Sequence, residues 1–277
     1  MLFLWLALIL ISLSIIHSLV THLISWRVQG FHFPIKGAMK GIVVAALCNL
    51  ALLLLYPLGL LPQGRTSPDV IKKNRPLLFV HGYFHNRSAF FPLRWYLRRR
   101  GLGHLYDINL RPRLGRIEDY APQLSLRISE ILKETGEDKI DLIGHSMGGL
   151  VCRYYIQELG GRVDKLITLA TPHQGTEVAR LGPGENARQM VPGSPLLKRL
   201  NQDEGWMEGV KVVSLWSSFD AMIIPARSAI LTGRSENIHL PLTGHNTFLF
   251  SRQVAAQLVR VLTSHQGRED ADHVPIP

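Results

Sequence analysis

The sequence predicts an α/β protein with a mainly parallel sheet, preceded by two membrane helices. Residues 1–62 contain two long uncharged apolar runs. From residue 75 onward, short apolar runs alternate with helical patterns, which is typical of a parallel sheet covered on both faces. One of the apolar runs leads into a serine between glycines, at residues 144–148 (GHSMG), and a helical pattern follows at once.

The two apolar runs, residues 1–26 and 41–61, are each long enough to cross a bilayer, which takes about 20 apolar residues. A cleaved signal peptide is the alternative for the first run. That run lacks a basic start, its apolar core is too long, and no small-residue cleavage site precedes Arg27. His17 and His22 either have a function inside the membrane or, as we expect, pair between the two helices or lie near an interface.

Basic residues around these runs bear on the side of the membrane that the rest of the chain occupies. Residues 1–62 contain no acid and carry three of the ten formal positive net charges. These three, Arg27, Lys36 and Lys40, lie in the short connection and favour a cytoplasmic connection. The basic residues after the second run favour the opposite orientation: Arg65, Lys72, Lys73 and Arg75. We expect the non-cytoplasmic side for the domain that follows these runs, because the first helix usually determines orientation.

Beyond a polar linker at residues 63–74, the pattern predicts one domain at residues 75–264 and a disordered tail at 265–277. Strands are expected at residues 76–80, 106–110, 139–143, 163–170, 210–216 and 237–242. Helices are expected at residues 89–100, 117–135, 147–159 and 246–264. Residues 174–208 are too long for an ordinary connection and predict a lid. The sequence contains no nucleic-acid-binding motif and no zinc-type cysteine spacing.

Ser146 lies at the end of a predicted strand and before a predicted helix, at the edge of the sheet where ligands bind. So tight a turn leaves no room for neighbouring side chains, which explains Gly144 and Gly148. The turn presents the hydroxyl at the amino end of a helix, where the N–H of Met147 points toward negative charge forming on a bound carbonyl. The pentapeptide alone arises by chance in about one chain in ten of this length, so other residues decide its meaning.

A serine hydroxyl needs a general base, which a carboxylate orients. Among twelve histidines, His245 follows the last predicted strand on a glycine turn and is the candidate base. His145, beside the serine, is expected to be structural. Asp220 follows the fifth predicted strand at the same rim as Ser146 and is the candidate carboxylate. The backbone N–H of Tyr83, after the first predicted strand, is the candidate for a second oxyanion donor.

Residues 76–264 resemble the α/β-hydrolase lipases and esterases, in particular the bacterial triacylglycerol-lipase-like group. The matching stretches are FVHGYFHN, IDLIGHSMGGLVCRYY, ITLATPHQGTEVA, SSFDAMIIP and TGHNTF. The resemblance implies an α/β-hydrolase fold in which Ser146 is the nucleophile and Asp220 and His245 complete a catalytic triad. It also implies that Tyr83 and Met147 supply the oxyanion N–H groups.

The resemblance further implies a lid with apolar residues that contact an acyl chain. The candidates for substrate contact are Phe84, after the first strand, and Met190, Leu196 and Leu197 in the lid. Some relatives hold calcium through an acidic residue two positions after the catalytic histidine, but that position is Thr247 here. We therefore expect neither a metal nor a cofactor.

Together these features predict a membrane-anchored serine hydrolase that cleaves carboxylic esters through an acyl-enzyme. Its expected partners are a lipid or acyl-ester substrate and the membrane, and not nucleic acid. An acyltransferase or thioesterase that uses the same three side chains is the alternative. A catalytically inactive, membrane-tethered interaction module is a third hypothesis. The sequence does not indicate which proteins, if any, bind to it.

Overall fold

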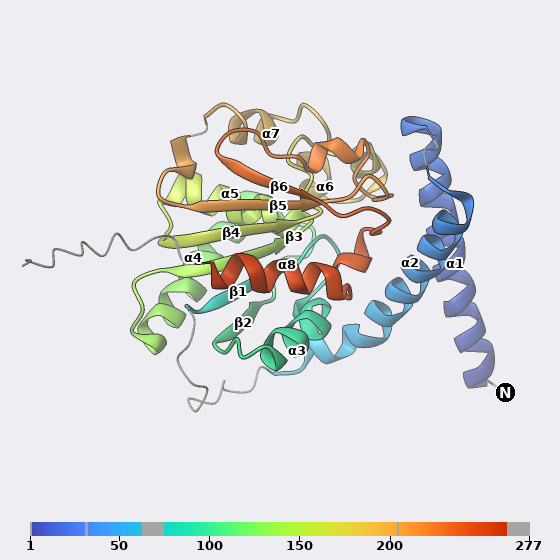
Figure 1. Ribbon diagram of the computed structural model, residues 1–277, viewed down its shortest axis with the longest axis horizontal. Helices are drawn as coiled ribbons and strands as arrows, with labels where there is room; N and C mark the ends of the chain where they lie inside the picture. The colour runs from blue at the N-terminus through green and yellow to red at the C-terminus, as the bar shows by residue number, and fades with distance from the viewer. Residues whose placement is uncertain (1, 31–32, 63–74, 204, 265–277) are drawn as a thin grey trace, which may run out of the picture.

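The computed structural model describes residues 2–30, 33–62, 75–203 and 205–264, so the predicted linker and the predicted tail lie outside the described residues. A six-stranded sheet forms the centre of the domain, with strand order β2-β1-β3-β4-β5-β6 (Figure 1). All neighbouring strands are parallel, which confirms the predicted architecture. The strands are β1 (Leu77–Val80), β2 (Leu105–Ile108), β3 (Ile140–His145), β4 (Val163–Leu169), β5 (Lys211–Trp216) and β6 (Ser235–His239).

Helices cover both faces of the sheet. They are α3 (Phe91–Arg99), α4 (Ile117–Thr135), α5 (Met147–Leu159) and α8 (Arg252–Thr263), with short turns η2 (Arg87–Phe90), η5 (Ala226–Ala229) and η6 (Asn246–Leu249). Successive residues of a strand point to opposite faces. Leu78 and Val80 accordingly pack in a core with α4 and α5, whereas Leu77 and Phe79 pack in a second core with α3 and α8.

The segment predicted as a lid contains η3 (Glu177–Leu181), α6 (Glu185–Gln189), α7 (Pro195–Leu200) and η4 (Gly205–Met207). Its second half is packed into the domain, because Leu196, Leu197 and Leu200 of α7 are buried in the same core as α5. Only the first half of the segment is therefore placed to border a site at the sheet edge.

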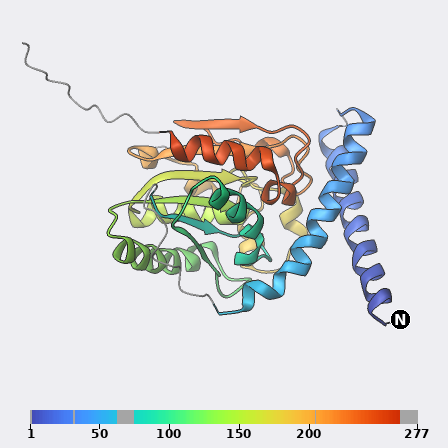
Figure 2. The ribbon, with the colours of Figure 1, turned by 60° about the horizontal axis from the view of Figure 1, so that its bottom comes forward.

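Two long helices form a hairpin beside the domain, at the end of the sheet toward which the strands run (Figures 1 and 2). They are α1 (Leu2–Gln29) and α2 (Ile35–Leu55), and η1 (Tyr56–Leu60) continues α2. Segments Leu8–Gln29 and Ile35–Leu60 are long and apolar enough to cross a membrane, with mean hydropathies of 2.0 and 2.3. Leu52 of α2 packs into the core beneath α3 and α8, so the hairpin contacts the domain directly.

Asp141 in β3 is a buried carboxyl group whose pKa makes the stability of the domain depend on pH. Its side chain is buried, and burial raises the pKa of its carboxyl to about 7, against the opposing effect of Lys165. The folded protein then keeps this proton up to about pH 7, while the unfolded chain releases it near pH 3.8. Because the folded state binds the extra proton, this carboxyl makes stability fall as pH rises from about 4 to about 7.

We expect Asp141→Asn to remove that loss. The free energy of unfolding of the variant should match the wild type near pH 4 and exceed it at pH 8 by on the order of 2–4 kcal/mol. Unfolding of the detergent-solubilised protein at several pH values measures the difference. Asp138→Asn is the matched control, since that carboxylate is exposed. Parallel pH profiles for the wild type and Asp141→Asn would contradict the expectation.

Candidate active site

The corner at Ser146, between β3 and α5, leaves no space for side chains around it. Ser146 has φ 54° and ψ −125°, a conformation that strains a residue with a side chain. A Cβ at Gly148 would lie 2.1 Å from the carbonyl oxygen of Val80, and one at Gly149 would lie 2.1 Å from Oγ1 of Thr171. Glycine at these positions lets the neighbouring chain segments approach closely and hold the serine in its strained conformation.

Asp220 and His245 meet beside this corner. Asp220 is buried after β5, and its Oδ1 accepts hydrogen bonds from the N–H groups of Met222 at 2.8 Å and Ile223 at 3.0 Å. Its Oδ2 lies 2.9 Å from Nδ1 of His245. A carboxylate can only accept, so Nδ1 of His245 holds the proton and Nε2 of the neutral ring has a free lone pair. This tautomer is the one that a general base requires.

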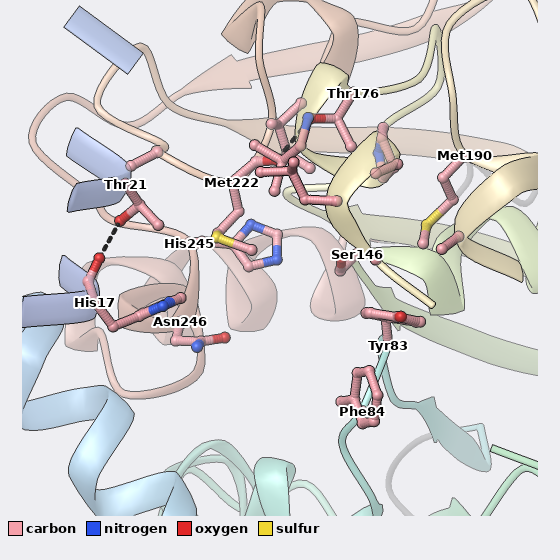
Figure 3. Close-up of a pocket in the computed structure, with 18 of the residues that line it drawn as sticks. His17, Thr21, Tyr83, Phe84, Ser146, Thr176, Met190, Met222, His245 and Asn246 are labelled. Atoms are coloured by element: carbon pink, nitrogen blue, oxygen red, sulfur yellow. Dashed lines mark hydrogen bonds between the residues drawn. The ribbon is translucent and has the colours of Figure 1, made fainter. Parts of the chain in front are cut away.

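Ser146 and His245 line the same cavity, which has a volume of about 320 Å³ (Figure 3). Within residues 2–30, 33–62, 75–203 and 205–264, no hydrogen bond joins the serine hydroxyl to the His245 ring. Such hydrogen bonds are often long before substrate binds. Among the same residues, no group of three or more His, Cys, Asp or Glu side chains is arranged to hold a metal ion.

A second imidazole supports the candidate base. Nε2 of His145 donates to the carbonyl oxygen of His245 at 3.2 Å, and the two ring centroids are 4.8 Å apart. Burial lowers the pKa of His145 well below its ordinary value and that of nearby His85 to about 4. Both rings are therefore neutral near pH 7, and neither places a positive charge beside His245 when that ring takes up a proton.

The loop after β1 passes directly over the serine. A Cβ at Gly82 would lie 2.9 Å from Cβ of Ser146. The ring of His81 fixes this loop, because its Nδ1 donates to the carbonyl oxygen of Gly82 at 2.9 Å and its Nε2 accepts a backbone N–H at 3.0 Å. In the described part of the chain, neither the N–H of Tyr83 nor that of Met147 donates a hydrogen bond. Both are free to bind a substrate oxygen.

The four residues predicted to contact substrate divide into two pairs. Phe84 and Met190 line the cavity, and Phe84 has a positive φ of 57° and is 48% exposed. Leu196 and Leu197 do not line it, because α7 turns them into the core against α5. The predicted lid instead borders the cavity through its earlier residues, which include Thr176, Val178, Ala179 and Leu181.

The hairpin forms another wall of the cavity, a connection that the sequence prediction missed. This wall contains His17, Ser18, Thr21, His22, Ala45 and Asn49. Figure 3 shows His17 and Thr21 on the same side of the cavity as Asn246, across His245 from Met190. One signal in the sequence was available. Polar residues recur at helical spacing along one side of the otherwise apolar first helix, at positions 14, 18, 22 and 25.

Comparison with known proteins gives one family match and several relatives. Residues 114–256, which include all three candidate triad residues, match the family described as PGAP1-like alpha/beta domain. Over 57 residues the chain is 42% identical to a triacylglycerol lipase of Pseudarthrobacter phenanthrenivorans, covering 21% of this chain and 18% of the lipase. Over 151 residues it is 29% identical to a GPI inositol-deacylase of Candida albicans, covering 54% of this chain and 30% of that protein. The chain thus spans less than a third of either relative.

Solved structures of lipases share the fold. A mature lipase of Bacillus licheniformis superposes with a TM-score of 0.61 at 19% identity, covering 73% of this chain and 96% of the lipase. Lipase B of Aspergillus fumigatus gives a TM-score of 0.63 at 16% identity, covering 72% of this chain and 56% of that protein. These similarities confirm the predicted α/β-hydrolase fold.

Proposed function

The chain belongs to the family of PGAP1-like alpha/beta domains, and from that premise we propose that it is a membrane-anchored serine hydrolase of carboxylic esters. The observation that carries the proposal is the hydrogen bond between Asp220 and His245 at a cavity that also exposes Ser146. The names of the relatives, a triacylglycerol lipase and a GPI inositol-deacylase, support lipid esters as the substrate class.

In the proposed reaction, Nε2 of His245 takes the proton of Ser146 as Oγ attacks the ester carbonyl carbon. Asp220 stabilises the protonated ring, while the N–H groups of Tyr83 and Met147 stabilise the oxyanion. When the tetrahedral intermediate collapses, the bond to the alcohol oxygen breaks and His245 returns the proton to that oxygen. The acyl group stays on Oγ. Water, deprotonated by the same ring, then attacks the acyl carbonyl, releases the acid and restores the serine hydroxyl.

We expect a fluorophosphonate probe to label the full-length protein in its membrane, because the probe reacts with a serine oxygen whose proton a neighbouring base removes. Ser146→Ala should abolish the label, and Ser129→Ala on the exposed side of α4 should keep it. Fluorescence of the separated protein reports the label, and mass spectrometry locates it. A wild type that does not react, or a Ser146→Ala variant that labels equally, would contradict the proposal.

Asp220→Asn should slow ester hydrolysis by about 10⁴-fold. This is the loss found when the triad aspartate of a serine protease is changed to asparagine. An amide at this position no longer fixes the proton on Nδ1 of His245. Steady-state kinetics measures the loss, and circular dichroism checks that the fold is kept. Asp203→Asn is the control, since that carboxylate is exposed in the lid segment. Unchanged turnover in Asp220→Asn would assign the orienting role to another group.

For the membrane, we propose that the hairpin attaches the enzyme, and the sequence predicts its catalytic domain on the non-cytoplasmic side. Arg27, Lys36 and Lys40, which favour a cytoplasmic connection between α1 and α2, flank a connection that lies beside the catalytic domain, because Oε1 of Gln29 accepts the N–H of Ala226. These charges therefore do not place the connection and the domain on opposite sides of a membrane, and protease accessibility decides the side. If the domain lies on the non-cytoplasmic side, protease added to intact cells should cut it. Protection in intact cells, with cleavage in inverted vesicles, would reverse the orientation.

A further inference from the structure

The cavity around Ser146 has two unlike sides. One side is mostly apolar and is formed by Val178, Ala179, Leu181 and Met190, with Tyr83 beside them. The other side is polar and is formed mainly by the hairpin: His17, Thr21, His22 and Asn49, with Asn246 of η6. Figure 3 shows the ring of His245 between the two sides.

The chemistry of ester cleavage assigns these sides to the two parts of the substrate. The protonated base gives its proton to the alcohol oxygen as the alcohol leaves. The alcohol portion must therefore lie within reach of His245, and the polar side continues from there. The apolar side suits the acyl chain, since it offers apolar surface and few hydrogen-bonding groups.

Several polar side chains of α1 serve the packing of the hairpin. Ser14 and Ser18 donate to backbone carbonyls of α2 at 2.5 Å and 3.1 Å. Oε1 of Gln29 accepts the N–H of Ala226 in the domain at 2.5 Å. Polar groups in an apolar helix are costly and need such partners. Within α1, the hydroxyl of Thr21 donates to the carbonyl oxygens of His17 and Ser18 at 2.9 Å and 3.1 Å. These contacts account for these four polar side chains of α1 but not for the two histidines that face the cavity.

The rings of His17 and His22 each keep a polar atom that no such contact uses. Within the part of the chain that the structure describes, no hydrogen bond reaches the ring of His17. His22 is 3% exposed, and its Nδ1 donates to the carbonyl oxygen of Ser18 at 2.7 Å. Its Nε2 is therefore an acceptor, and it is buried with no hydrogen-bond partner among the described residues. A buried acceptor needs a donor, and a hydroxyl group of a ligand supplies one.

We propose that His17, Thr21 and His22 form a binding site for the alcohol portion of the ester, and that this alcohol carries free hydroxyl groups. The inference rests on the proposed hydrolase activity and adds that the membrane hairpin supplies one wall of the active site. The ring of His22 is held for this role against Phe219, with centroids 4.6 Å apart.

Two esters with the same acyl chain test the proposal: monooctanoylglycerol, whose alcohol keeps two hydroxyls, and methyl octanoate, whose alcohol has none. The variants are His22→Phe, which keeps an aromatic ring against Phe219, and His17→Leu. Each should lower kcat/KM for the glycerol ester about two- to tenfold relative to the methyl ester, the loss expected for one hydrogen bond. Ser12→Ala, a polar residue exposed on the outer side of α1, should leave the ratio unchanged.

Fluorophosphonate labelling of each variant separates binding from assembly of the triad. Suppose that a variant is labelled at the wild-type rate and that its ratio of kcat/KM for the glycerol ester to kcat/KM for the methyl ester is unchanged, whether both values stay the same or fall equally. That result would overturn the inference and leave the proposed function intact. Loss of labelling in both variants would assign the two histidines to packing and also overturn it. If only one variant fails to label, the inference is tested by the ratio of kcat/KM for the two esters in the variant that still labels. A wild type that neither labels nor cleaves either ester contradicts the hydrolase proposal itself.

Discussion

Close contact between α2 and the rim of the sheet is the constraint on which the site depends. A Cβ at Gly41 of α2 would come within 2.5 Å of the ring of Phe219, and one at Gly59 of η1, which continues α2, within 2.0 Å of the amide of Asn86. Ala45 lies between them on the same face, four residues beyond Gly41. Small side chains here let the helix approach loops that larger residues would push away, which is how small residues act between membrane helices.

The loops that α2 contacts carry the proposed catalytic groups. Phe219 precedes Asp220, and Asn246 follows His245 and donates to Oδ1 of Asn49 at 2.8 Å. If the two helices were joined to the domain only through a flexible linker, they would not contact this rim of the sheet. Here the helices that the sequence presents as an anchor also hold the residues next to the carboxylate and the base. A change in the hairpin therefore acts on the active site directly and not only on its location.

Sequence reasoning succeeded where the signal is local. Helix α4 and helix α5 begin and end at the predicted residues, because apolar spacing and a following glycine define them. The sequence could also place Asp220 and His245 at one rim, since each follows a strand of a parallel sheet. It failed for Leu196 and Leu197, whose apolar character fits a lid as well as a core. In the structure α7 packs against α5, so both leucines belong to the core. A contact between two helices that are distant in the chain leaves no pattern in the local sequence.

The face of the hairpin that points away from the domain is apolar, and it lies opposite the face that borders the cavity. Met39, Val43 and Leu47 recur every four residues on α2 and are 64%, 58% and 60% exposed. A bilayer that covered them would lie level with the cavity on the other face of the helix. Moving an acyl chain from lipid into water costs about 0.8 kcal/mol per CH₂. If the hairpin lies in a membrane as proposed, a cavity bordered by its helices would let a lipid ester approach Ser146 while its chain stays in an apolar phase. Under the same proposal these helices would present polar groups to the alcohol, and the two faces together would favour an amphipathic ester over a soluble one.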